Sequence, residues 1–260
     1  MLILLPPSEG KRAPRRGRPL DLATLSFSAL EPHRGEMLDA LVSLCTTDEP
    51  AAAAGVLGLG PTQVDEVARD AGLLSAPTAR ADAVYSGVLY EALDLGSLDT
   101  AARRRATAWL AITSGLFGLL RPGDRIPAYR LSGDVTLPGL GTVSTYWSRR
   151  LDDTVRAAAG RGLVVDLRST TYASFWRPAP DLAAKVVTVR VLQDSAGRRT
   201  VVSHFNKATK GRLVRTLLEA GDAPGSPARF ADHLGALGWK VEHDGTGRHG
   251  TRLDVVVGEL

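Results

Sequence analysis

Polar and charged side chains repeatedly follow short apolar runs, in loops that contain or border glycine. The first such loop places Ser8, Glu9 and Lys11 directly after the run 2–5. A short strand fixes a loop of this kind, and the loop offers free backbone N–H groups, so ligands are often bound there. The remaining residues of this type are Tyr85, Ser114, Tyr129, Arg130, Asp166, Arg168 and Ser169. We expect these segments to converge on one concave site.

A further segment, His204 to Gly211, places Lys207 and Lys210 three residues apart at the start of a predicted helix. Residues three apart share one face of a helix, and the N-terminal end of a helix is the positive end of its dipole. This combination suits a phosphate group.

The residue types suggest two sets of roles. If the protein is an enzyme, the groups suited to acid–base or nucleophilic work are Glu9, Ser114, Tyr129, Asp166 and Lys207. The groups suited to holding a ligand are Ser8, Lys11, Tyr85, Arg130, Arg168, Ser169 and Lys210. The alternative for each residue is a structural role or a solvated surface position.

Hydrophobic periodicity predicts a mixed α/β fold. Apolar runs at 2–5, 110–113 and 163–167 indicate buried strands, and helical spacing indicates helices around 38–45, 64–68, 99–107 and 142–159. Residues 84–87 resemble a strand end, and 185–192 with 200–205 resemble a β-hairpin followed by helices over 207–218 and 228–237. A final strand pair is expected at 239–242 and 252–257. Without a linker or repeat, residues 1–260 are predicted to form a single compact domain, a mixed sheet flanked by helices.

Composition narrows the class of protein. A single cysteine, Cys45, excludes an internal disulfide and fits a reducing compartment. The apolar start ends at Pro6 after four residues, too short for a secretory signal, and no window is long enough to span a membrane. No metal-ligand spacing and no glycine-rich nucleotide fingerprint occurs. We therefore expect a cytoplasmic protein with no membrane partner, no metal and no cofactor.

Basic residues cluster locally in a chain whose net charge is +4. The loop after the first strand carries Lys11 and several arginines, which could bind phosphate or could be a solvated loop in an arginine-rich chain. The run Arg103 to Arg105 is more typical of a solvated helix face. The segment Leu137 to Gly141 matches the hairpin of helix-hairpin-helix DNA-binding elements, although no helix is predicted before it; the alternative is a simple turn.

The order of the motifs resembles that of the YaaA family across nearly the whole chain. The matching segments are Met1 to Lys11, Ser114 to Pro122, Tyr129 to Leu131, Tyr146 with Trp147, Asp166 to Tyr172, and Lys207 to Gly211. Many relatives begin Ser-Pro-Ala-Lys where this chain has Pro-Ser-Glu-Gly-Lys, which indicates a divergent, arginine-rich branch. The resemblance implies one compact mixed α/β unit, DNA binding and a role in limiting iron-driven oxidative damage.

Two functions from different classes follow. The first is a cytoplasmic protein of the peroxide-stress response that binds nucleic acid, such as double-stranded DNA, through a basic cleft. The second is an enzyme that acts on a nucleobase, nucleoside or nucleotide. Carboxylates such as Glu9 and Asp166 beside phosphate-binding cations favour the enzyme, because a carboxylate repels phosphate. A third reading, an interaction protein without catalysis, predicts that the polar groups are dispersed.

Overall fold

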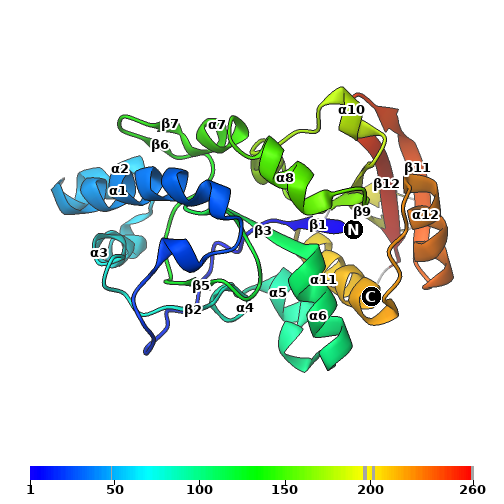
Figure 1. Cartoon of the computed structure of the whole chain (residues 1–260), viewed down its shortest axis with the longest axis horizontal. Coiled ribbons are helices and arrows are strands. Elements are labelled where there is room, and N and C mark those ends of the chain that lie inside the picture. Colours follow the sequence, from blue (N-terminus) through cyan, green and yellow to red (C-terminus); the bar gives the residue numbers. More distant parts are fainter. Residues whose placement is uncertain (48, 196–197, 201–202, 259–260) are drawn as a thin grey trace.

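The computed structural model describes residues 1–47, 49–195, 198–200 and 203–258 (Figure 1). In the interior of its largest sheet, β1 (Leu2–Leu5) pairs in parallel with β3 (Leu110–Ser114) and β8 (Val164–Asp166). Residues 2–5 are all fully buried, which explains their continuous apolar run, since a strand covered on both faces needs no polar alternation. The predicted mixed α/β class is confirmed.

In the described part of the chain this sheet has the order β11-β12-β9-β8-β1-β3-β4, with β10 paired to β9. The pairs β1–β3, β1–β8, β8–β9 and β9–β12 are parallel, and the pairs at both edges are antiparallel. The outer strands are β4 (Gly118–Leu120), β9 (Val186–Ser195), β10 (Arg198–Thr200), β11 (Lys240–Gly247) and β12 (Gly250–Val257).

Helices cover both faces of the parallel strands. In Figure 1, α5 (Val88–Leu93), α6 (Thr100–Trp109) and α11 (Ser203–Ala220) lie on one side of β1, and α8 (Asp152–Ala159) lies on the other. The start of α6 is fixed by Asp99, whose side chain accepts a hydrogen bond from the backbone N–H of Ala102 at 2.7 Å.

A group of helices lies beyond the carboxyl end of β1: α1 (Glu31–Thr47), α2 (Pro50–Val56) and α3 (Asp65–Ala71) (Figure 1). The remaining α-helices are α4 (Ala81–Val84), α7 (Val143–Ser148), α9 (Thr170–Ala173), α10 (Pro180–Ala183) and the ten-residue α12 (Pro227–Ala236). The 3-10 turns are Leu22–Thr24, Ser28–Leu30, Pro61–Gln63 and Leu95–Ser97. Two small antiparallel sheets complete the fold. One pairs β2 (Ala79–Arg80) with β5 (Arg125–Ile126), and the other is a hairpin of β6 (Thr136–Leu137) and β7 (Gly141–Thr142).

The strand order creates a topological switch point at β1. The chain first adds β3 on one side of β1 and later returns to add β8 on the other side. In open α/β sheets the loops at such a point diverge to opposite faces and leave a crevice at the carboxyl ends of the strands, where ligands bind. The loops that follow β1, β3 and β8 all start at this edge.

Three local predictions are wrong. The helix predicted for residues 142–159 is broken at 149–151, because the backbone tightens there into a turn in which the Arg150 N–H bonds to the Trp147 carbonyl at 2.9 Å. Residues 203–205, predicted as strand, already belong to α11, and residues 201–202 lie outside the described part. Val84 ends the short helix α4 instead of a strand.

The core extends across the sheet and its helices. Buried apolar side chains form one cluster from Leu2 to Val255. The single domain over residues 1–260 stays a prediction. Within the described residues, no helix is long and apolar enough to cross a membrane.

Candidate functional site

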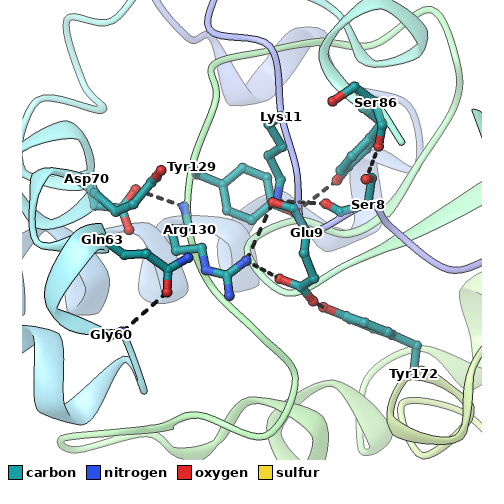
Figure 2. Close-up of polar contacts among 12 residues, drawn as sticks. Ser8, Glu9, Lys11, Gly60, Gln63, Asp70, Ser86, Tyr129, Arg130 and Tyr172 are labelled. Atoms are coloured by element: carbon teal, nitrogen blue, oxygen red, sulfur yellow. Dashed lines mark hydrogen bonds and ion pairs between the residues drawn. The ribbon is translucent and has the colours of Figure 1, made fainter. Parts of the chain in front are cut away.

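The loop after β1 meets two other predicted segments through Glu9. One carboxylate oxygen, Oε2, accepts a hydrogen bond from Arg130 Nη1 at 2.6 Å, and the other, Oε1, accepts one from the hydroxyl of Tyr172 at 3.1 Å (Figure 2). Tyr172 lies on α9, directly after the β8 loop. Glu9 therefore ties together three segments that are far apart in the sequence.

Three hydroxyl groups form a buried chain beside this pair. The Tyr129 hydroxyl lies 2.8 Å from the Tyr85 hydroxyl and 2.7 Å from Ser114 Oγ, which also accepts the N–H of Phe117 at 3.0 Å. Burial raises the pKa of Tyr85 to about 12 and the pKa of Tyr129 well above its usual range. Both phenols therefore stay neutral near pH 7 and can pass or donate protons.

Lys11 lies against the two tyrosine rings. Its Nζ is 4.3 Å from the centre of the Tyr129 ring and 5.6 Å from that of Tyr85, and it donates a hydrogen bond to the carbonyl of Ser8 at 3.0 Å. Burial lowers the pKa of Lys11 to about 8, and the charge of Glu9 partly opposes this shift. The amine is therefore available in both protonation states slightly above neutral pH.

Asp70 completes the cluster from α3. The residue is fully buried, and its Oδ1 accepts the backbone N–H of Arg130 at 2.9 Å (Figure 2). Among the described residues, its Oδ2 has no hydrogen-bond partner. Burial raises the pKa of Asp70 to about 7, with the backbone hydrogen bond from Arg130 opposing the shift. A second group in this cluster thus titrates near neutral pH.

Ser8 anchors the loop to the segment before α5. Its Oγ donates a hydrogen bond to the carbonyl of Ser86, and Lys11 forms an isolated β-bridge with Tyr85. Gly87 has a φ of 106°, and a Cβ at this position would lie 3.0 Å from Ser8 Oγ. Only glycine fits this left-handed backbone and close approach without strain.

The end of β8 differs from this cluster. Asp166 and Arg168 form a buried ion pair at 2.7 Å, and the Arg168 guanidinium also donates to the carbonyls of Tyr172 and Trp176. Burial alone would raise the pKa of Asp166, but Arg168 outweighs it and holds the pKa below its usual value. Both side chains are fully engaged in holding the loop, so a structural role suits them.

The remaining predicted residues are spread along the β8 loop and α11. Lys210 Nζ donates to the carbonyl of Leu167 at 2.9 Å, and burial lowers its pKa to about 8. Ser169 precedes α9 and is exposed. Lys207 is also exposed, and the prediction that it starts a helix is wrong, because α11 begins at Ser203 and places Lys207 in its second turn. The dipole argument for phosphate at Lys207 is therefore lost.

Two surface pockets flank the cluster. The larger, of about 970 Å³, has Tyr85, Ser86 and Tyr90 on one wall, and the smaller, of about 480 Å³, is lined by Arg130 and Ser132. We call the larger one the arginine groove, after four of its lining residues, Arg12, Arg80, Arg103 and Arg104.

Comparison with known proteins gives the family. The family described as "Peroxide stress protein YaaA" matches residues 1–233. The chain belongs to the YaaA family. A UPF0246 protein of Streptomyces coelicolor is 50% identical over 262 residues, which cover 100% of both chains. A UPF0246 protein of Corynebacterium efficiens is 42% identical over 244 residues, 93% of this chain and 95% of the relative, and one of Shewanella loihica is 29% identical over 231 residues, 84% and 86% of the two chains.

Within this YaaA-family chain, the structure adds two residues that sequence reasoning missed. Tyr172 lies in the predicted segment that begins at Asp166, so its position was available, but nothing in the sequence paired it with Glu9. Asp70 carried no signal, because it is one of several acidic residues on an ordinary amphipathic helix. No group of three or more His, Cys, Asp or Glu side chains that could hold a metal is found in the described residues.

Proposed function

We propose that this chain acts in the peroxide-stress response as a cytoplasmic nucleic-acid-binding protein, and that the arginine groove receives the phosphate backbone. The observation that carries the proposal is the meeting of Arg12 with Arg103 and Arg104 around one groove. These residues come from the β1 loop and from α6, about 90 positions apart in the sequence. Clustered guanidinium groups suit phosphate because they donate paired hydrogen bonds to its oxygens.

The charge balance of the groove supports an anionic ligand. Two of its acidic residues already have basic partners: Asp82 pairs with Arg80 at 2.6 Å, and Asp94 lies 3.8 Å from Arg215. The charged lining residues that remain are Arg12, Arg103, Arg104 and Glu91. Three arginines and one glutamate leave an excess of positive charge in the groove, which favours a phosphate ligand.

The mode of binding follows from the burial of the aromatic residues. Tyr85 and Tyr90 stack with ring centres 5.5 Å apart, but both are buried, so neither offers a free face to a base. The exposed arginines of the β1 loop extend the basic surface, namely Arg12, Arg15, Arg16 and Arg18. We therefore expect contacts with the backbone and little sequence preference.

The test is duplex DNA binding measured by fluorescence anisotropy as a function of salt. Wild-type affinity should fall by about 10-fold or more between 50 and 200 mM salt, because phosphate contacts release counterions. The double variant Arg12→Ala/Arg104→Ala should bind more weakly and lower the salt slope by about 2. Arg248→Ala, an exposed arginine at the opposite edge of the sheet, is the matched control. If the double variant bound DNA with the same affinity and the same salt dependence as the wild type, the proposal would be contradicted.

A second function is favoured by a specific observation. Lys11 and Asp70 both titrate near neutral pH beside a chain of neutral hydroxyl groups, and such perturbed groups gather at catalytic sites. An enzyme that acts on a nucleobase, nucleoside or nucleotide would use them for proton transfer. Incubation with a panel of nucleosides and nucleotides, followed by chromatography, tests this. If a product forms with the wild type and is lost in Arg130→Ala, the enzyme hypothesis is supported. If no member of the panel gives a product, the hypothesis is rejected.

A further inference from the structure

The smaller pocket, of about 480 Å³, has one polar wall and one apolar wall. The polar wall is a single segment of the chain, and its side chains are those of Arg130, Ser132, Asp134 and Thr136. The apolar wall includes the end of α2, with Val56 and Leu57. Val56 is a large apolar side chain that is 37% exposed. The volume lies in the range of small-molecule sites, about 300–1,000 Å³, and a ligand with an apolar body would cover Val56.

Arg130 has a free guanidinium edge at this pocket. Its Nη1 is bound to Glu9, 2.6 Å from the carboxylate Oε2 and 3.5 Å from the backbone carbonyl, and the dashed lines from the guanidinium in Figure 2 lead to Glu9. The Nε and Nη2 atoms make no hydrogen bond among the described residues, and neither atom is buried. The N–H groups of this edge are parallel and match the two oxygens of a carboxylate. The edge is therefore available to an anion in the pocket.

The position of Arg130 is fixed from both ends. Its backbone N–H donates to the buried Asp70 at 2.9 Å. The carboxylate of Glu9, which holds the guanidinium, also accepts a hydrogen bond from the Tyr172 hydroxyl at 3.1 Å, and the side chain of Ser132 interacts with that same hydroxyl. A side chain that is ordered before the ligand arrives loses less entropy when it binds.

The charges around the smaller pocket favour an anion with a single charge. Its charged lining residues are one cation, Arg130, and one anion, Asp134, and Glu9 already shares the guanidinium. The arginine groove, by contrast, has an excess of positive charge. A phosphate group carries a charge of about −1.5 to −2 at neutral pH, so both carboxylates would repel it more strongly than they repel a carboxylate.

We propose that the smaller pocket binds a small monocarboxylate with an apolar body. The carboxylate lies on the Nε and Nη2 edge of Arg130, and the apolar body lies against Val56 and Leu57. The hydroxyl groups of Ser132 and Thr136 are available to further polar groups of the ligand. This site goes beyond both functions proposed above, because it needs neither the arginine groove nor a chemical step.

The test uses benzoate, which combines a carboxylate with an apolar ring. The full-length chain, labelled with ¹⁵N, is titrated at pH 6.5, and the Nε–H signal of Arg130, assigned by its absence in Arg130→Lys, is followed by NMR. Benzoate should shift this signal until the site is saturated. Benzamide has nearly the same shape without the charge, and should bind about 10-fold or more weakly because the charge-assisted hydrogen bonds are lost. Phenyl phosphate should also bind more weakly than benzoate.

Variants with opposite expected effects sharpen the test, and backbone amide signals report their affinity for benzoate. Arg130→Lys keeps the charge but not the paired N–H groups, and should weaken binding by about 10-fold. Glu9→Gln removes the competing negative charge, and should strengthen binding by about 3-fold or more. Val56→Ser should weaken the binding of benzoate but not that of acetate, which has no ring. Arg248→Ala, at an exposed arginine outside the lining of the pocket, is the matched control and should bind as the wild type does.

The outcomes separate this site from DNA binding. A saturable shift of the Arg130 signal by benzoate, with weaker binding in Arg130→Lys and stronger binding in Glu9→Gln, supports the proposal. The absence of a saturable shift, or unchanged affinity in Arg130→Lys, overturns it. Tighter binding of phenyl phosphate than of benzoate overturns the assignment to a carboxylate. Arg130→Lys should keep wild-type affinity for duplex DNA, because Arg130 does not line the arginine groove.

Discussion

The ends of β1 and β8 look alike in the sequence but differ in the structure. Each strand is short and mainly apolar, and at or just beyond its end each has a carboxylate and a cation two residues apart. After β8, Asp166 and Arg168 pair with each other and are buried. After β1, Glu9 and Lys11 reach to different partners, Arg130 and the tyrosine rings. Asp166 and Arg168 pair with each other and so stabilise their own loop. Glu9 and Lys11 contact residues of other segments and so bring these segments together.

The difference has a physical cause. A buried ion pair with every hydrogen bond satisfied has one stable protonation state, so it cannot exchange protons near pH 7. The β1 cluster contains Asp70, with one unpaired oxygen, and Lys11, with a lowered pKa, and both can change charge near neutrality. Structures tolerate such unsatisfied groups mainly where they serve a function.

The largest expected effect is on the β8 pair. Arg168→Ala should lower the free energy of unfolding by about 3–5 kcal/mol, because it leaves the Asp166 charge buried without a partner. Chemical denaturation at pH 7 measures this. The double variant Asp166→Ala/Arg168→Ala should lose clearly less than the sum of the two single variants. A small effect of Arg168→Ala alone would show that the β8 end is not a structural pair.

The next effect concerns Asp70 and depends on pH. Its folded pKa of about 7 lies above the ordinary value of 3.8 for an aspartate, so the folded state binds the extra proton and is favoured at low pH. That contribution is lost as pH rises from about 4 to 7. Relative to Asp70→Asn, the wild type should therefore lose about 1–4 kcal/mol between pH 4.5 and 8, because one pKa unit corresponds to about 1.4 kcal/mol. If the free energy of unfolding of the wild type and of Asp70→Asn changed with pH in the same way, the raised pKa of Asp70 would be refuted.

The smallest effect compares two tyrosines of the β1 cluster. Tyr129→Phe removes a buried hydroxyl that bonds to Tyr85 and Ser114, and should cost about 1–2 kcal/mol. Tyr172→Phe removes a hydroxyl that donates to the half-exposed Glu9 and also interacts with Ser132, and should cost less than about 1 kcal/mol. Thermal unfolding of the two variants side by side measures the difference, and equal losses would contradict the distinction.

Much of this architecture was predictable from the sequence. Continuous apolar runs identified β1, β3 and β8, and the residues that follow them do meet at one edge of the sheet. The pairing of those residues was not predictable, because Glu9, Arg130 and Tyr172 are joined only by the fold. Asp70 is the clearest case, since its burial depends on where α3 packs. The break at 149–151 was missed because apolar spacing continues across it.

The central claim is that the β1 end holds groups poised to change charge, and the most direct test is the titration of Lys11. With lysine labelled by ¹³C at Cε, the Lys11 signal can be assigned by its loss in Lys11→Arg and followed by NMR from pH 6 to 11. We expect a midpoint near pH 8, well below the ordinary lysine value of 10.5. A midpoint at the ordinary lysine value would contradict it, because the amine would then be an ordinary ammonium ion held by the aromatic rings.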